Sequence, residues 1–190
     1  LNHMQQLIDR HPNNEDYLKL MAMILSNKGM TDNYTAGSQV AEVTHRKALK
    51  IRKKLVADNP LVTDYINGLA VSHANLADSL YYLEKHDEEI VNRKESVRLL
   101  RQLAASQPTT DRYLAFAAVN GVRQCRAHYL LGDVDSTVRV FRTMLDWQPD
   151  FRPEVGERSN RAQQYWVALC YALLASREDV PAIRESYIER

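Results

Sequence analysis

Residues 41–60 read AEVTHRKALKIRKKLVADNP, and residues 64–70, just beyond them, read DYINGLA. They form one unit of an internal repeat, because a proline and a tyrosine recur at matching places: Pro12 with Tyr17, Pro60 with Tyr65, and Pro108 with Tyr113. Both residues step by 48 positions each time, and Pro149 follows the last proline after 41. Self-similarity at a fixed period of this size is typical of repeat architectures, in which each unit packs on its neighbours. We therefore expect one repeat domain.

The composition fits a packed domain without a strongly charged partner. Hydrophobic residues make up 45% of the 190 residues and charged residues 26%, and the formal net charge is only +1. This balance argues against nucleic acid or an anionic membrane as the main partner. No apolar run approaches the roughly 20 residues that span a bilayer, no signal-peptide pattern opens the sequence, and two cysteines cannot build a disulfide framework. We expect a cytoplasmic chain without membrane contact.

The spacing of apolar residues predicts helices along the whole chain. Sustained period-two alternation is absent, so no strand is expected. One apolar stripe at helical spacing consists of Tyr65, Leu69, Leu76, Leu80 and Leu83. The predicted helices span residues 1–11, 14–27, 36–57, 64–84, 88–106, 108–131, 135–147, 159–176 and 180–190, with an irregular stretch at 150–156. The first helix is expected to begin upstream of the sequence, and the last to continue beyond it.

Local signals predict how the second of these helices begins and ends. Asn14 is expected to cap its first turn, with Glu15 and Asp16 placed favourably near its positive end. The turn-rich residues 28–33 are expected to end it near Asn27.

Two segments resemble a known family. Residues 41–49, AEVTHRKAL, and residues 75–81, NLADSLY, are similar to tetratricopeptide repeats, most of all to the kinesin-light-chain-like and bacterial multi-repeat variants. The family's unit has about 34 residues. The excess of about 14 can be placed as two blocks of seven, each about two helical turns, which lengthen a helix without rotating its apolar face.

The resemblance implies an all-α, right-handed solenoid of antiparallel helix pairs over residues 1–190. Its repeats would be residues 13–60, 61–108 and 109–149, with the end of a preceding repeat at 1–12 and a partial one at 150–190. Where the family has a glycine between paired helices, this chain has Ala36, Glu84 and Gly132. Glu89 and Arg93 stand at places that the family keeps small or aromatic, so they affect how the second repeat packs.

In such a solenoid, the first helix of each pair lines a concave groove that binds a peptide or a helix of a partner. Tyrosine and arginine are enriched in binding hot spots, although the tyrosines could instead simply pack neighbouring helices. The Lys and Asn set with which part of the family holds a C-terminal carboxylate is not found here. The predicted groove residues are Met23, Ser26, Val71, Ala74, Asp78, Tyr81, Tyr82, Val119, Val122, Arg126 and Tyr129.

Other candidate sites are weaker. The basic run could meet phosphates, but it has no interleaved aromatic residues, and a solvated face explains it as well. The histidines are scattered without metal-ligand spacing, Cys125 and Cys170 fall at small buried places, and no phosphate loop or nucleophile motif occurs. We expect no catalytic residue, metal or cofactor. The basic run consists of His45, Arg46, Lys47, Lys50, Arg52, Lys53 and Lys54.

These observations favour a protein–protein interaction module whose partner is a protein or peptide. By family analogy, arrays with this extended spacing are similar to those that follow bacterial Ser/Thr kinase domains, so the chain is expected to belong to a larger signalling protein. Two alternatives stay open. One is an oligomerisation scaffold that self-associates, and the other is an all-α domain that binds a small ligand or acts as an enzyme.

Overall fold

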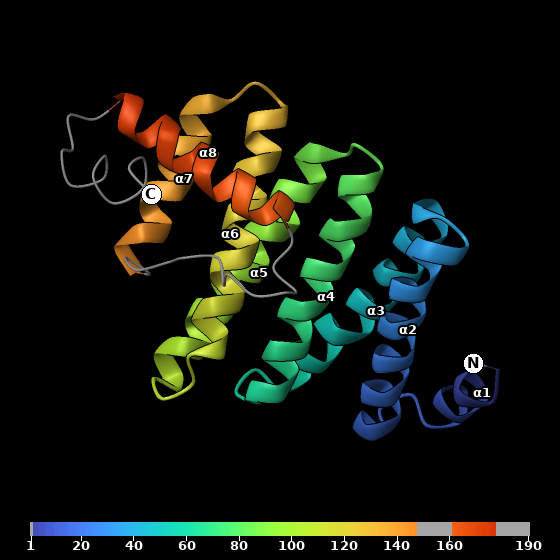
Figure 1. The fold of residues 1–190 in the computed structure, drawn as a ribbon. Coiled ribbons are helices and arrows are strands. Elements are labelled where there is room, and N and C mark those ends of the chain that lie inside the picture. Colours follow the sequence, from blue (N-terminus) through green and yellow to red (C-terminus); the bar gives the residue numbers. More distant parts are fainter. Residues whose placement is uncertain (1, 148–160, 178–190) are drawn as a thin grey trace.

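The computed structural model describes residues 2–147 and 161–177, and every regular element in this part is an α-helix, as predicted. Figure 1 shows the helices in chain order, from α1 at one end of the molecule to α7 and α8 at the other. From α2 onward, each helix packs on the next. The bounds are α1 Asn2–Arg10, α2 Glu15–Thr35, α3 Ser38–Asp58, α4 Thr63–Tyr82, α5 His86–Ser106, α6 Arg112–Leu130, α7 Val134–Trp147 and α8 Arg161–Arg177. The irregular stretch predicted at 150–156 and the helix predicted from residue 180 lie outside the described residues.

The helices recur with the period seen in the sequence. α3, α5 and α7 begin at Ser38, His86 and Val134, which stand 48 residues apart. α2, α4 and α6 each precede one of these three helices, so the chain forms successive helix pairs, α2 with α3, α4 with α5 and α6 with α7. The described part is therefore a helical-repeat-like array. None of its helices is long and apolar enough to cross a membrane.

The turns after α4 and α6 are the same motif one period apart. Glu84 has φ 58° and Gly132 has φ 77°, so both lie in the left-handed region. In each turn, the next residue's N–H donates to the carbonyl five residues earlier, at 3.0 Å after α4 and 2.9 Å after α6. This hydrogen bond is the outer one of a Schellman motif, whose left-handed position favours glycine. Glu84 occupies it at a conformational cost.

α2 continues to Thr35, so the prediction that it ends near Asn27 is wrong. Lys28 and Asp32 stand four residues apart and form an ion pair at 2.6 Å. The Asp32 carboxylate also accepts a hydrogen bond from the Thr44 hydroxyl of α3 at 2.9 Å. These contacts hold turn-type residues in a helix, because packing on a neighbouring helix outweighs their weak local propensity.

The predicted cap of α2 is confirmed. Oδ1 of Asn14 accepts a hydrogen bond from the backbone N–H of Tyr17 at 3.0 Å. α6 begins at Arg112 and not at Pro108, because the N–H of Thr110 donates to the Gln107 carbonyl and closes a turn there. The sequence therefore places helix starts most accurately where a capping side chain marks them.

Apolar side chains gather in two large clusters along the array. One cluster joins α3 to α6 and includes Leu76, Leu80, Leu100 and Leu103, each no more than 1% exposed. The other joins α6 to α8 around Phe141. Both clusters include side chains of α6, so this helix links the two.

One buried layer changes its chemistry from unit to unit. Its members come from equivalent places in α3, α5 and α7, one period apart, and all are at most 1% exposed. The first and third helix pairs supply small or uncharged residues from α3 and α7. The middle pair, α4 with α5, supplies a charged pair from α5; we call each helix pair a unit. The sets are Ala41 with His45, Glu89 with Arg93, and Thr137 with Phe141.

Candidate functional site

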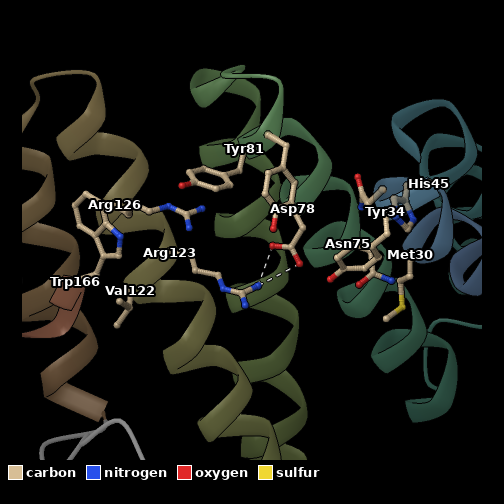
Figure 2. A pocket seen from close by; sticks show the side chains of 12 residues that line it. Met30, Tyr34, His45, Asn75, Asp78, Tyr81, Val122, Arg123, Arg126 and Trp166 are labelled. Carbon is tan, nitrogen blue, oxygen red and sulfur yellow. Dashed lines mark hydrogen bonds and ion pairs between the residues drawn. The ribbon is translucent and has the colours of Figure 1, made fainter. Parts of the chain in front are cut away.

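Four alternate helices, α2, α4, α6 and α8, line a cavity of about 430 Å³, to which α3 adds His45. Figure 2 shows Arg123, Arg126 and Trp166 at one end, and Tyr34 and His45 at the other, with Asp78 and Tyr81 between them. We call this cavity the Asp78 pocket. Its size lies within the range of ordinary ligand sites. Its lining residues are Met30, Asn33, Tyr34, His45, Asn75, Asp78, Tyr81, Tyr82, Val122, Arg123, Arg126 and Trp166.

A buried ion network supports the Asp78 pocket from α5. Arg93 is 0% exposed and donates to Oδ1 of Asp78 at 2.5 Å and to Oδ1 of Asn120 at 3.0 Å. It also lies 3.5 Å from a carboxylate oxygen of Glu89, which is equally buried. Burial lowers the pKa of Arg93, and the Asp78 carboxylate opposes that effect. Arginine is the most basic of the side chains, so the guanidinium of Arg93 stays charged. A buried charge of this kind depends on its ion-pair and hydrogen-bond partners.

Two arginines of α6 cross the space to α4. Nη1 of Arg123 donates to both carboxylate oxygens of Asp78, at 2.8 Å and 3.2 Å, as the dashed lines in Figure 2 show. The guanidinium of Arg126 lies 3.4 Å from the ring centroid of Tyr81 and donates to Glu89 at 2.7 Å. A cation stacked on an aromatic face and paired with a buried carboxylate is held in one orientation. These contacts fix the walls of the pocket.

The cluster carries more positive than negative charge. Three guanidinium groups, those of Arg93, Arg123 and Arg126, meet the two carboxylates of Asp78 and Glu89. The side chain of Arg123 is 35% exposed, so it can reach a ligand in the pocket while Arg93 cannot. The Asp78 pocket is therefore suited to a group with negative charge or with hydrogen-bond acceptors.

His45 supplies unused polar atoms at the other end of the pocket. Its ring is 1% exposed, and neither ring nitrogen has a hydrogen-bond partner within the described residues. Burial lowers the pKa of His45, while Asp78 and Asp32 oppose the effect. The ring is therefore neutral at pH 7, with one nitrogen as a donor and the other as an acceptor. Buried polar atoms without partners are rare in native proteins, so this ring is a candidate contact for a ligand.

Exposed aromatic side chains lie in or beside the Asp78 pocket. Tyr34 is 87% exposed and Tyr82 is 61% exposed. Tyr82 lies against Tyr81, with ring centroids 5.3 Å apart, and Tyr129 lies edge-on to Trp166 at 5.8 Å. Large aromatic groups that remain in water favour a partner that would cover them.

Five of the eleven predicted groove residues line the Asp78 pocket: Asp78, Tyr81, Tyr82, Val122 and Arg126. Val122 is only 1% exposed, however, and belongs to the core cluster around Phe141. Ala74 is 2% exposed and is not among the lining residues, and its carbonyl accepts a hydrogen bond from the buried Arg93. Outside the set that lines the pocket, Met23 and Tyr129 are exposed, and Ser26, Val71 and Val119 are partly buried.

Sequence reasoning missed several lining residues. Arg123 follows Val119 by one helical turn and precedes Arg126 by three residues, so the same spacing that selected those two could have selected it. Tyr34 lies between the helices predicted at 14–27 and 36–57, so no helical spacing selects it. In the sequence, His45 belongs to the basic run. Its burial follows from packing against Gly29 of α2, which the sequence alone does not show.

The basic run does not form one continuous surface. His45 is buried, Arg46 pairs with Glu42 and Glu88, and Nζ of Lys54 donates to the Pro12 carbonyl at 3.0 Å. Lys47, Lys50 and Lys53 are exposed. Three of the seven residues of the run are therefore buried or paired within the protein, which leaves fewer cations for phosphates than the sequence indicates.

The described residues offer little for metal binding or for thiol chemistry. Among them, no group of three or more His, Cys, Asp or Glu side chains could hold a metal ion. Cys125 and Cys170 are buried, at 0% and 1% exposure. Burial raises the pKa of the Cys125 thiol, and the neighbouring Cys170 adds to this, so Cys125 is a poor nucleophile.

Comparison with known protein families, curated proteins and solved structures found no match to this chain.

Proposed function

We propose that this chain is a protein-interaction module that holds a short peptide segment of a partner in the Asp78 pocket. The observation that carries the proposal is the convergence of Asp78 and Tyr81 from α4 with Arg123 and Arg126 from α6 on one cavity of about 430 Å³. The charge excess favours a segment with an acidic side chain. The relation to tetratricopeptide repeats is part of this proposal, because members of that family bind peptides between such helices.

A fixed arginine with exposed tyrosines nearby supports a binding role for the Asp78 pocket. Arg126 is held by Glu89 and stacked on Tyr81, so it would lose little freedom when a ligand arrives. Tyr34 and Tyr82 expose most of their rings and could cover an extended segment on both sides. Rigid polar anchors with exposed aromatic neighbours are the composition of binding hot spots.

A selection from a random peptide library displayed on phage tests the proposal. Peptides that bind the immobilised protein are expected to contain an acidic residue. Their affinity is expected to fall about tenfold or more in the variant Tyr34→Ala, Tyr82→Ala, Arg123→Ala, since each change removes a contact at the pocket. Arg93 and Glu89 are left intact in this variant, so the pocket keeps its support.

The matched control is Leu61→Ala with Val91→Ala, which truncates two exposed apolar side chains away from the pocket. Equal loss in both variants, or selected peptides whose binding ignores the pocket changes, would contradict the proposal. An oligomerisation scaffold would instead give a solution mass that rises with protein concentration and changes little in the pocket variant.

A further inference from the structure

A second cavity lies on the other side of α6. It has a volume of about 520 Å³ and is lined by α5, α6 and α7. α6 gives Arg123 and Arg126 to the Asp78 pocket but Gln124 and His128 to this cavity. At about 100° per residue, the two sets point in nearly opposite directions from the helix axis. We call this cavity the Trp147 groove. It is independent of the proposed peptide site.

The floor and walls of the Trp147 groove are apolar. α5 and α7 both pack on α6 (Figure 1). Each of the two helices contributes a stripe of lining residues at helical spacing. Gly121 of α6 lines the groove and allows close packing of Met144, whose Sδ would lie 3.3 Å from an added Cβ. The apolar side chains of the stripes are Ile90, Val97, Val140, Met144 and Trp147. Such a surface takes up an apolar body of ligand size.

Cations surround this apolar floor, and none of the lining residues that the structure describes carries a carboxylate. Within the described residues, Lys94 and Arg101 form no ion pair, and Arg139 donates only to the Ser136 hydroxyl, at 2.6 Å. Arg98 is the exception, because Glu95 pairs with it at 2.7 Å. The guanidinium of Arg101 lies 5.2 Å from the ring of Trp147, which places a cation directly at the edge of the apolar surface. The charge of the groove is therefore strongly one-sided.

A buried amide adds a polar contact inside the groove. Gln124 is 7% exposed, and its side chain makes no hydrogen bond with the residues that the structure describes. His128 lines the groove beside it and lies 3.5 Å from Asp133. A side-chain amide offers both donors and an acceptor, so Gln124 could bind a polar group of a ligand that has entered the groove.

We propose that the Trp147 groove binds a small amphiphilic organic anion. The apolar body lies between the stripes of α5 and α7, and the anionic head lies at the rim, where Lys94 and Arg101 meet it. Charge complementarity carries this choice: an apolar floor alone would accept a neutral molecule, whereas unpaired cations at its rim gain most from a negative head.

Fluorescence of 8-anilinonaphthalene-1-sulfonate, an aromatic sulfonate, tests the proposal on the whole chain. The probe is expected to bind saturably, and decanoate is expected to displace it at concentrations at which decanol, its uncharged match, does not. The variant Lys94→Glu, Arg101→Glu is expected to lower the affinity about tenfold or more. Thr143 lines the groove and is exposed, so the variant Thr143→Trp is expected to narrow the groove. It should therefore lower the affinity for the probe without any change of charge.

The matched control is Lys47→Glu with Lys50→Glu, which makes the same change in net charge on the exposed face of α3. It is expected to leave the affinity within about twofold. Binding that falls equally in the control, that ignores Thr143→Trp, or that accepts decanol as well as decanoate would overturn the proposal. So would the absence of saturable binding by the folded protein.

Discussion

Replacing Gly29 by Ala is expected to destabilise the protein, although the same change in most helices is stabilising. An added Cβ would lie 2.5 Å, 2.6 Å and 2.7 Å from Cε1, Nδ1 and Nε2 of His45. Contact between such atoms is favourable only at about 3.5–4.0 Å. The His45 ring is 1% exposed, so it cannot swing into solvent. Either the ring must shift toward the Asp78 pocket or α2 must move away from α3.

The expected magnitude follows from two opposing terms. Alanine gains about 1 kcal/mol over glycine inside a helix. Overpacking of a buried site costs about 1–3 kcal/mol. The net loss of unfolding free energy is then about 1 kcal/mol and at most about 2 kcal/mol, which lowers Tm by about 2–8 °C for a chain of this size.

Gly68→Ala is the matched control for this prediction. Its added Cβ would lie 2.6 Å from Nη1 of Arg52, which is nearly the same overlap. The neighbour here is the end of a flexible side chain that is only partly buried, so it can move away. Gly68→Ala is therefore expected to stabilise the protein by up to about 1 kcal/mol.

Urea unfolding followed by circular dichroism measures both variants. The reasoning would be refuted if Gly29→Ala were stabilising by as much as Gly68→Ala. A second comparison isolates the cause: in a His45→Ala background the overlap is gone, so adding Gly29→Ala is expected to raise stability relative to His45→Ala alone.

Three further predictions concern the charged layer, pH and the turns. Arg93→Phe is expected to lower the unfolding free energy by about 3–5 kcal/mol, because it leaves the buried Glu89 carboxylate with one partner fewer. Adding Glu89→Thr gives this layer the residues of the third unit and should recover part of that loss in urea unfolding. A double variant no more stable than Arg93→Phe would contradict this account. Burial lowers the pKa values of His45, His73 and His128, so the unfolded chain takes up protons first as pH falls below the ordinary histidine value of about 6.5. The unfolding free energy is therefore expected to fall below that pH, by up to about 1.4 kcal/mol per pH unit for each histidine. An unfolding midpoint that stays level or rises from pH 7.5 to 5.5 would count against this sign. Glu84→Gly is expected to stabilise and Gly132→Ala to destabilise, each by about 1 kcal/mol, since both turns need a left-handed residue and nothing lies within 4 Å of an added Cβ at Gly132; equal signs for the two variants in thermal unfolding would refute the equivalence of the turns.

The sequence predicts what depends on local spacing. The 48-residue step of Pro and Tyr anticipates the equal spacing of Ser38, His86 and Val134 at the starts of three helices. Spacing along α4 and α6 also anticipated that Tyr81 and Arg126 would face the same side. These features follow from helical geometry within one element.

The sequence does not predict what depends on distances between units. The end of α2 is set by Asp32 and its hydrogen bond from Thr44, a residue of the next helix. Glu89 and Arg93 look misplaced in the sequence because their partners come from α4 and α6. The Trp147 groove needs two stripes, on α5 and α7, whose separation is fixed only when both pack on α6. A residue pattern describes one helix at a time, so it contains no information on the distances between helices.

The charged layer of the middle unit also determines the order of the array. If the middle unit were copied in tandem, its next neighbour would present Ser72 and Asp78 where Asn120 and Arg126 now stand, because these pairs are one period apart. Glu89 would then face a carboxylate and no longer an arginine, and Arg93 would lose an amide partner. Lengthening the protein by duplicating this module would bury like charges against each other. The succession of units is therefore specified by complementary chemistry, and the middle unit is not interchangeable with its neighbours.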